Sequence, residues 1–232
     1  NLERRRWLKR EVAPERIEVN TAAAIMVYWK DGKPVHSNRV VVGSAENQTP
    51  SLEKPFASVV ANPPWYVPAG IARREILPKG PGYLAANDMY VKDGTVIQRA
   101  GPRSALGYVK FELRDSYAIF LHDTPARNLF SQENRALSHG CIRTERAQEL
   151  AITLAILGNL ANTPEARKAA ADEAVAISTS GKYTRVPIQK SMPVYITYFT
   201  MGRDINGTLR EFSDIYGRDA PVLASFDAPR QS

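Results

Sequence analysis

The sequence has few of the residues that build disulfide or metal sites. It holds one cysteine, Cys141, and three histidines, His36, His122 and His139. A single cysteine excludes an intrachain disulfide. One cysteine with two nearby histidines also lacks the fourth ligand of a typical structural zinc site. We therefore expect no metal and no cofactor.

Long apolar runs are missing as well. No stretch approaches the roughly 18 uninterrupted apolar residues that a membrane span requires, so no span is expected in this sequence. The chain opens at Asn1, without methionine, a signal-like apolar run or a cleavage site. We expect it to be a processed or excised piece of a longer protein, which is compatible with export because signal peptides are removed.

Acidic residues are fewer than basic ones, and the net charge is +7. Residues 1–16 hold six basic and three acidic residues and so carry +3 of that charge. A basic surface favours anionic partners, but neither zinc-ligand spacing nor an RNA-binding signature accompanies it. We interpret residues 1–16 as a solvated basic arm, expect no nucleic acid as partner, and note that a carboxylate-rich substrate would suit the charge.

Apolar periodicity predicts a mainly β chain with helices (α+β). Asp31-Gly32 is a two-residue hairpin signal, and Asn206-Gly207 marks a second turn. Thr163-Pro164 is typical of a helix start. Because strands and helices do not alternate, a doubly wound sheet is disfavoured. The predicted strands are 17–29, 35–43, 56–61, 107–113, 117–121, 193–200 and 209–215, and a helical pair is predicted at about 144–180.

Residues 62–101 differ from the rest because proline and glycine are dense there. Such residues oppose long regular elements, and the interleaved aromatics, including Trp65 and Tyr83, argue against disorder. A loop-rich stretch of this length is commonly a functional lid; the alternative is a structural elaboration without a part in chemistry. The predicted organisation is a basic arm at 1–16, catalytic parts at 17–61 and 102–219 around this insert, and a loose tail at 220–232.

The residues around Cys141 could support nucleophilic catalysis. A thiol attacks as its thiolate, which an imidazole or a helix N-terminus favours, and we expect a helix to begin near Thr144. Gly140 permits a sharp turn, so backbone N–H groups around Gly140 and Cys141 are candidate oxyanion donors. The base could be His122, at the end of a predicted strand, or His139; spacing does not decide between them.

Ser138-His139-Gly140-Cys141, with His122 sixteen residues before the serine, resembles the signature of the L,D-transpeptidase catalytic domain. The similarity to the large Gram-negative subfamily of that family extends over most of the chain. It includes the segments 62–68, 76–79, 105–111, 122–125, 129–130 and 214–219. The resemblance implies a mixed β-sandwich in which the insert 62–101 caps the active site.

The resemblance also implies a mechanism. Cys141 would attack the bond between diaminopimelate and D-alanine in a peptidoglycan tetrapeptide stem, and an acceptor amine would resolve the thioester. His122 would be the base, and the backbone carbonyl of Asp123 would orient its ring. His139 and Gly140 would shape the oxyanion hole. The residues expected to bind substrate are Ser138, which would also support the site by hydrogen bonds, Arg143, which would hold a carboxylate, and Trp65 and Tyr83 in the cap.

Two other functions remain open from the sequence. The same site could serve hydrolysis, as an L,D-carboxypeptidase or an amidase that releases wall-linked proteins, or the chain could be a non-catalytic peptidoglycan-binding module. The intact motif argues against the last. The resemblance further implies periplasmic or cell-envelope localisation, with export or membrane anchoring of the full-length protein, and covalent inhibition by carbapenems.

Overall fold

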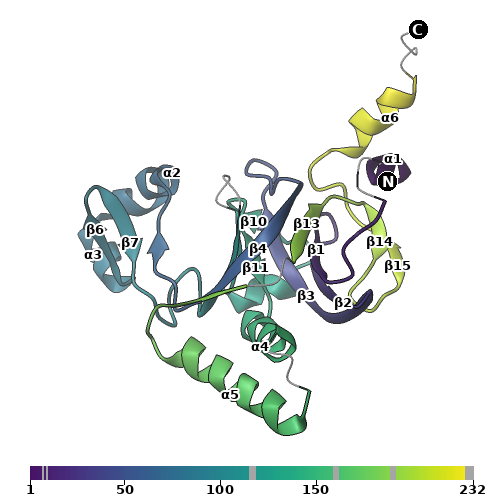
Figure 1. Cartoon of the computed structure of the whole chain (residues 1–232). Coiled ribbons are helices and arrows are strands. Elements are labelled where there is room, and N and C mark those ends of the chain that lie inside the picture. Colours follow the sequence, from purple (N-terminus) through teal and green to yellow (C-terminus); the bar gives the residue numbers. More distant parts are fainter. Residues whose placement is uncertain (7, 9, 115–118, 159–161, 189–191, 228–232) are drawn as a thin grey trace.

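The protein is a mixed β-sandwich with a separate insert on one side (Figure 1). The computed structural model describes residues 1–6, 8, 10–114, 119–158, 162–188 and 192–227. One layer contains β1 (Arg16–Asn20), β2 (Ile25–Lys30) and β13 (Pro193–Thr197), and the other contains β8 (Val109–Leu113), β9 (Leu121–His122), β10 (Ala136–Ser138), β11 (Ile142–Thr144) and β12 (Thr184–Pro187). The predicted α+β class and mixed sandwich are confirmed.

Two long strands join the layers. They are β3 (Lys33–Gly43) and β4 (Leu52–Ala61). The first half of β3 pairs with β2, and its second half pairs with β11. The strand order is β10-β3-β11-β9-β8-β4-β13-β1-β2, with β12 on β4 and a further pairing between β2 and β3. Because β3 and β4 pass from one layer to the other, the end of β3 lies beside β11, the strand that directly follows the candidate nucleophile Cys141.

The core fills the space between the layers. Side chains alternate across a strand, so every second residue of β1 and β2 faces inward. The core side chains from both layers include Ile17, Val19, Met26, Tyr28, Val40, Val42, Phe111, Leu121 and Ile142. Asp31 and Gly32 have φ of 51° and 72°, as the turn of the predicted β2–β3 hairpin requires.

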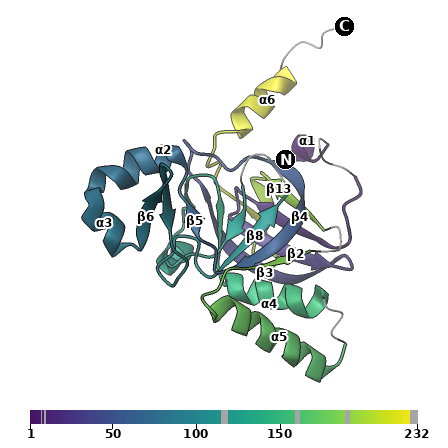
Figure 2. The ribbon, with the colours of Figure 1, turned by 60° about the vertical axis from the view of Figure 1, so that its left-hand side comes forward.

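The predicted helical pair is present as α4 (Ala147–Gly158) and α5 (Pro164–Thr179). Helix α4 lies against one face of the sandwich, and α5 lies beside α4 on the side away from the sandwich (Figures 1 and 2). In α4, Ala147, Leu150 and Leu154 are buried in the core. The Thr163 side chain accepts a hydrogen bond from the Ala166 N–H, so the predicted N-cap of α5 is confirmed.

The insert has a small core of its own. It is formed by Val67, Ala72, Ile76, Met89 and Val96, with Trp65, Ile71, Tyr83 and Leu84 packed against it. Its elements are β5 (Trp65–Tyr66), α2 (Ala69–Ile71), the π-helical turn η1 (Ala72–Ile76), the 3₁₀ turn η2 (Leu77–Lys79), α3 (Gly80–Ala86), β6 (Met89–Lys92) and β7 (Thr95–Gln98). The elements are short, as the density of proline and glycine predicts.

Some predicted boundaries are wrong. The expected strand at 17–29 is two strands, because the chain turns at residues 21–24 and Ala24 takes φ 51°. Of the expected strand at 117–121, residues 117 and 118 lie outside the described residues, and strand pairing begins at Leu121. Of the tail predicted at 220–232, residues 220–227 belong to helix α6 (Asp219–Asp227), which projects from the sandwich in Figure 2, and residues 228–232 lie outside the described residues.

The remaining elements lie near the chain ends and in the loop before β10. They are α1 (Leu2–Arg6), the 3₁₀ turn η3 (Arg127–Ser131), β14 (Met201–Arg203) and β15 (Leu209–Glu211). The last two form a hairpin around the predicted Asn206-Gly207 turn, in which the Gly207 N–H donates to the Asp204 carbonyl. Within the described part of the chain, no helix is both long enough and apolar enough to cross a membrane.

Candidate active site

The pairing of β8, β9 and β11 brings the candidate catalytic residues together. Arg143 in β11 stands opposite His122 in β9, and Lys110 in β8 stands opposite His122 on the other side. The Ile142 N–H donates to the Phe120 carbonyl, so the pairing continues to the residue after Cys141. Cys141 immediately precedes β11, so its backbone lies beside the start of β9, two residues before the Arg143 that pairs with His122.

Electrostatics agree with this placement. Burial lowers the pKa of Arg143, and the charge of Cys141 opposes that shift, which requires the two side chains to be close. The residue Cys141 is partly exposed. The paired strands therefore bring an imidazole and two cationic side chains close to a partly exposed cysteine.

His122 is held as a neutral base. Its Nδ1 lies 2.6 Å from the carbonyl oxygen of Asp123. A carbonyl oxygen only accepts, so Nδ1 carries the proton and Nε2 keeps a lone pair. Burial lowers the pKa of His122 to about 4, with smaller contributions from Arg143 and Lys110, while the bond to Asp123 opposes the shift. At neutral pH the ring is uncharged and can accept a proton at Nε2.

Asp123 is itself rigidly placed. Its carboxylate is fully buried, and Oδ2 accepts a hydrogen bond of 2.9 Å from the Tyr108 N–H. Arg127 lies 2.7 Å from Oδ1. That contact is an ion pair and not an aligned hydrogen bond, because Oδ1 has no hydrogen-bond donor among the described residues. The backbone carbonyl that orients His122 is thus fixed by the side chain of the same residue.

Gly107 makes room for this carboxylate. An added Cβ would stand 2.3 Å from Oδ2 of Asp123, and Gly107 has φ +59°. We expect Gly107→Ala to lower the unfolding free energy by more than about 2 kcal/mol, from left-handed strain and from displacement of a buried carboxylate. Thermal unfolding with an activity assay tests this, and Gly94→Ala, at φ +75° with open space around it, is the matched control. If the two variants were equally stable, the close approach to Asp123 would not matter.

A tight turn presents Cys141. The Ser138 hydroxyl donates to the Cys141 carbonyl at 2.5 Å and accepts from the Gly140 N–H at 3.1 Å. Gly140 has φ +113°, a conformation that side chains disfavour. The Gly140 N–H is therefore used inside the turn, which corrects the expectation that it is an oxyanion donor. Ser138 supports the turn, and its expected direct contact with substrate stays a prediction.

The predicted helix start near Thr144 is wrong. Residues 142–144 form β11, paired with both β3 and β9, and α4 begins only at Ala147. The field of a helix end falls off within its first turn. Cys141 is therefore not part of the first turn of α4, and β11 stands between the two in the sequence.

His139 points toward the insert. Its Nε2 lies 2.8 Å from Oε1 of Glu75 in η1, and both side chains are about two-fifths exposed. Sequence reasoning did not find Glu75, because nothing local links it to a residue 64 positions away. It also missed Phe120, whose ring packs edge-on against His122 with centroids 5.6 Å apart; its place two residues before His122, on the same strand face, was the available signal.

The two aromatic residues of the insert that are expected to contact substrate both contact other residues of the insert. Trp65 and Tyr83 both pack against the insert's own core. The ammonium group of Lys79 lies 4.4 Å from the Tyr83 ring centroid. Substrate binding by these aromatics stays a prediction. No group of three or more His, Cys, Asp or Glu side chains suited to a metal ion occurs among the described residues.

Comparison with known proteins identifies the family. Residues 14–196 match the family model of the L,D-transpeptidase catalytic domain. The chain therefore belongs to the L,D-transpeptidase catalytic-domain family. It is 34% identical over 229 residues to a Haemophilus influenzae protein named "Putative L,D-transpeptidase", an alignment that covers 89% of this chain and 45% of that protein. The chain thus spans about half the length of this curated relative.

Solved structures resemble the chain more distantly. One is the catalytic domain of the E. faecium L,D-transpeptidase acylated by ertapenem, with 16% identity, 80% of this chain and 98% of that chain covered, and a TM-score of 0.38. Another is L,D-transpeptidase 3 from Mycobacterium tuberculosis in complex with a faropenem-derived adduct, with 12% identity, coverage of 79% and 60%, and a TM-score of 0.41. The family assignment rests on the sequence match.

Proposed function

We propose that this chain is the catalytic domain of a peptidoglycan L,D-transpeptidase in which Cys141 is the nucleophile and His122 its base. The observation that supports the proposal is the strand register, which pairs Arg143 with His122 and so brings Cys141, the residue before β11, next to the strand that carries the imidazole. His122 keeps a lone pair at Nε2 because the Asp123 carbonyl accepts from Nδ1. In this arrangement Asp123 orients His122, and His122 removes the proton of the Cys141 thiol.

The proposed reaction has two halves. His122 takes the thiol proton as the sulfur attacks the carbonyl between the L-centre of diaminopimelate and the terminal D-alanine. The C–N bond breaks, the imidazolium protonates the leaving nitrogen, and D-alanine departs from a thioester on Cys141. The amine of an acceptor stem attacks the thioester, His122 accepts its proton, and that proton returns to the released sulfur. A carbapenem would acylate the same sulfur by ring opening.

The half-buried cation next to His122 suits the substrate. Arg143 stands beside His122 and within electrostatic range of Cys141. A guanidinium binds carboxylates in a planar, two-bond geometry. We propose that Arg143 holds a carboxylate of the donor stem, which brings the scissile carbonyl to the sulfur. We assign the role of base to His122 and not to His139, whose Nε2 contacts Glu75 of the insert.

The direct test is incubation with purified disaccharide tetrapeptide, with and without an acceptor stem, followed by mass analysis of the products. We expect D-alanine release and an acceptor-dependent crosslinked dimer. If an added acceptor gave only the hydrolysed tripeptide, the carboxypeptidase alternative would replace transpeptidation. Action in the cell envelope belongs to the same proposal, since the substrate is found there.

We further propose that the insert acts as a lid and that Glu75 holds it against His139. An exposed side-chain contact of this kind is worth at most about 1 kcal/mol, or roughly fivefold in an equilibrium. We therefore expect Glu75→Ala to raise the ratio of hydrolysis to transfer by up to about fivefold, because water reaches the thioester more easily. Product ratios measure this effect.

Two comparison variants sharpen this test. Glu75→Gln keeps a hydrogen-bonding group at the same place and should lie between Glu75→Ala and the parent protein. Glu173→Ala changes an exposed carboxylate on α5 and should leave the ratio unchanged. An unchanged ratio in Glu75→Ala would remove the proposed role of this contact.

A further inference from the structure

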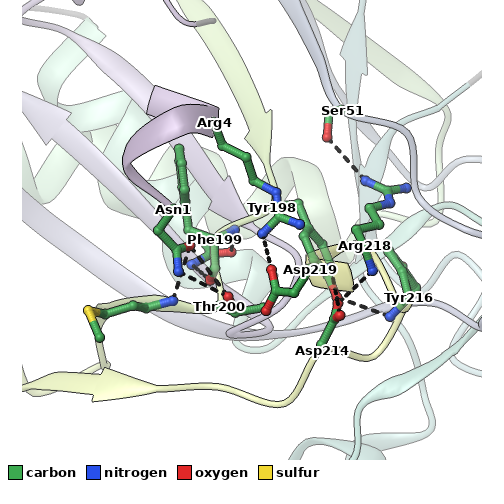
Figure 3. Close-up of polar contacts among 12 residues, drawn as sticks. Asn1, Arg4, Ser51, Tyr198, Phe199, Thr200, Asp214, Tyr216, Arg218 and Asp219 are labelled. Atoms are coloured by element: carbon green, nitrogen blue, oxygen red, sulfur yellow. Dashed lines mark hydrogen bonds and ion pairs between the residues drawn. The ribbon is translucent and has the colours of Figure 1, made fainter. Parts of the chain in front are cut away.

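The C-terminal segment 214–219 has no part in the mechanism above, although the sequence singles it out. It forms a compact polar cluster beside the end of β13 (Figure 3). Tyr216 stacks on Tyr198 with ring centroids 5.3 Å apart, and its N–H donates to the Tyr198 hydroxyl at 3.0 Å. That hydroxyl in turn bonds to Asp214, whose carboxylate also accepts from the N–H groups of Arg218 and Asp219. The position of the Tyr216 ring is therefore fixed.

Tyr216 reaches from this cluster to the loop between β3 and β4. Its hydroxyl donates to the Gly43 carbonyl at 2.7 Å and accepts from the Thr49 N–H at 3.2 Å. Arg218 binds the same loop through Gln48 Oε1 at 2.6 Å. An added Cβ at Gly43 would stand 2.0 Å from the Asn47 carbonyl oxygen, which shows how closely the loop folds over the end of β3.

The Thr49 side chain connects this loop to the turn that carries the nucleophile. Thr49 is fully buried. Its hydroxyl accepts from the Gly43 N–H at 2.9 Å and donates to the Gly140 carbonyl at 2.7 Å. The peptide that joins Gly140 to Cys141 is planar and trans, so its N–H points opposite to its C=O. A bond that fixes the Gly140 carbonyl therefore fixes the direction of the Cys141 N–H.

We propose that Thr49, held in place by Tyr216, is a positioning residue for the Cys141 N–H as an oxyanion donor. Ser138 fixes the carbonyl on the other side of Cys141, so the two hydroxyls together set the peptides before and after the nucleophile. The inference rests on the proposed function, because an oxyanion forms only if Cys141 attacks a carbonyl. Oxyanion stabilisation requires a donor whose direction is fixed in advance. The buried Thr49 hydroxyl provides this by its bond to the Gly140 carbonyl.

The test compares two reactions of the same thiol. Acylation by a carbapenem or by the tetrapeptide donor passes through an oxyanion, whereas alkylation by iodoacetamide is a displacement at carbon that forms none. We expect Thr49→Val to slow acylation roughly 10- to 100-fold, below the loss for complete removal of a donor. Alkylation, measured over a range of pH, should stay within about twofold. Thr49→Ser keeps the hydroxyl and should restore acylation.

Further variants keep the inference falsifiable if Thr49→Val folds poorly. Tyr216→Phe removes one hydroxyl outside the turn and should slow acylation severalfold with alkylation unchanged. Thr179→Val, at an exposed threonine on α5, should change neither rate. Equal losses in acylation and alkylation, or an unchanged acylation rate in both Thr49→Val and Tyr216→Phe, would overturn the inference while leaving the proposed function intact. Failure of the parent protein to be acylated, with normal alkylation, would overturn both.

Discussion

Replacement of Cys141 by alanine is expected to abolish D-alanine release and crosslinking, with a loss of at least about a thousandfold. Removing the attacking atom eliminates the covalent route, and binding and polarisation alone leave only a small residual rate. Cys141 is partly exposed, so loss of one sulfur should change the unfolding free energy by less than about 1 kcal/mol. Product analysis with the tetrapeptide donor, beside a thermal unfolding measurement, separates lost chemistry from lost structure. Crosslinking at the parental rate would remove Cys141 from the mechanism.

Replacement of His122 by glutamine is expected to reduce acylation by about 10²- to 10⁴-fold, the usual range for a general base. Glutamine can still donate to the Asp123 carbonyl but accepts no proton at neutral pH. The pKa of His122 is lowered to about 4, so acylation by the parent protein should persist to about pH 5 and fall as the pH passes through 4. This acid limb should be absent from the residual activity of the variant.

The same pKa has a consequence for stability. The pKa of His122 is about 4 in the folded protein and near 6.5 in an unfolded chain. Between these values the unfolded state binds more protons, so His122 destabilises the folded protein as the pH falls through this window. The His122→Gln variant should lose less stability than the parent between pH 6.5 and 4.

His36→Gln is the matched control for the effect on acylation. His36 lies on β3, away from the motif, and burial lowers its pKa as well. It should keep parental acylation at neutral pH. A parental acylation rate in His122→Gln would transfer the role of base to another group, with His139 the first to examine.

The sequence predicted correctly those turns and helix ends whose conformation depends only on neighbouring residues. Asp31-Gly32 forms the hairpin because both residues tolerate positive φ, and Thr163-Pro164 starts α5 because its cap needs only neighbouring atoms. The turn at residues 21–24 was missed because three of its four residues are alanines, which carry no turn signal. Helix α4 begins later than predicted because residues 142–144 pair with strands distant in the sequence.

The residues of the candidate site likewise fall into those that the sequence could identify and those that it could not. Cys141 and His122 could be singled out because their chemistry is rare in this sequence, which has one cysteine and three histidines. Thr49 and Glu75 could not, because an ordinary loop threonine and a surface glutamate gain their importance only from contacts 91 and 64 positions away in the chain. Gly140 was correctly expected in a sharp turn, but the use of its N–H by Ser138 depends on a hydrogen bond that no spacing reveals.

The most direct test of the account is the site of covalent modification by a carbapenem. Intact-protein mass spectrometry followed by peptide mapping should find one adduct, on the peptide that contains Cys141, which forms at a rate that depends on His122. A protein that stays unmodified at saturating carbapenem, or whose adduct maps to a residue other than Cys141, would contradict the assignment of this sulfur as the nucleophile.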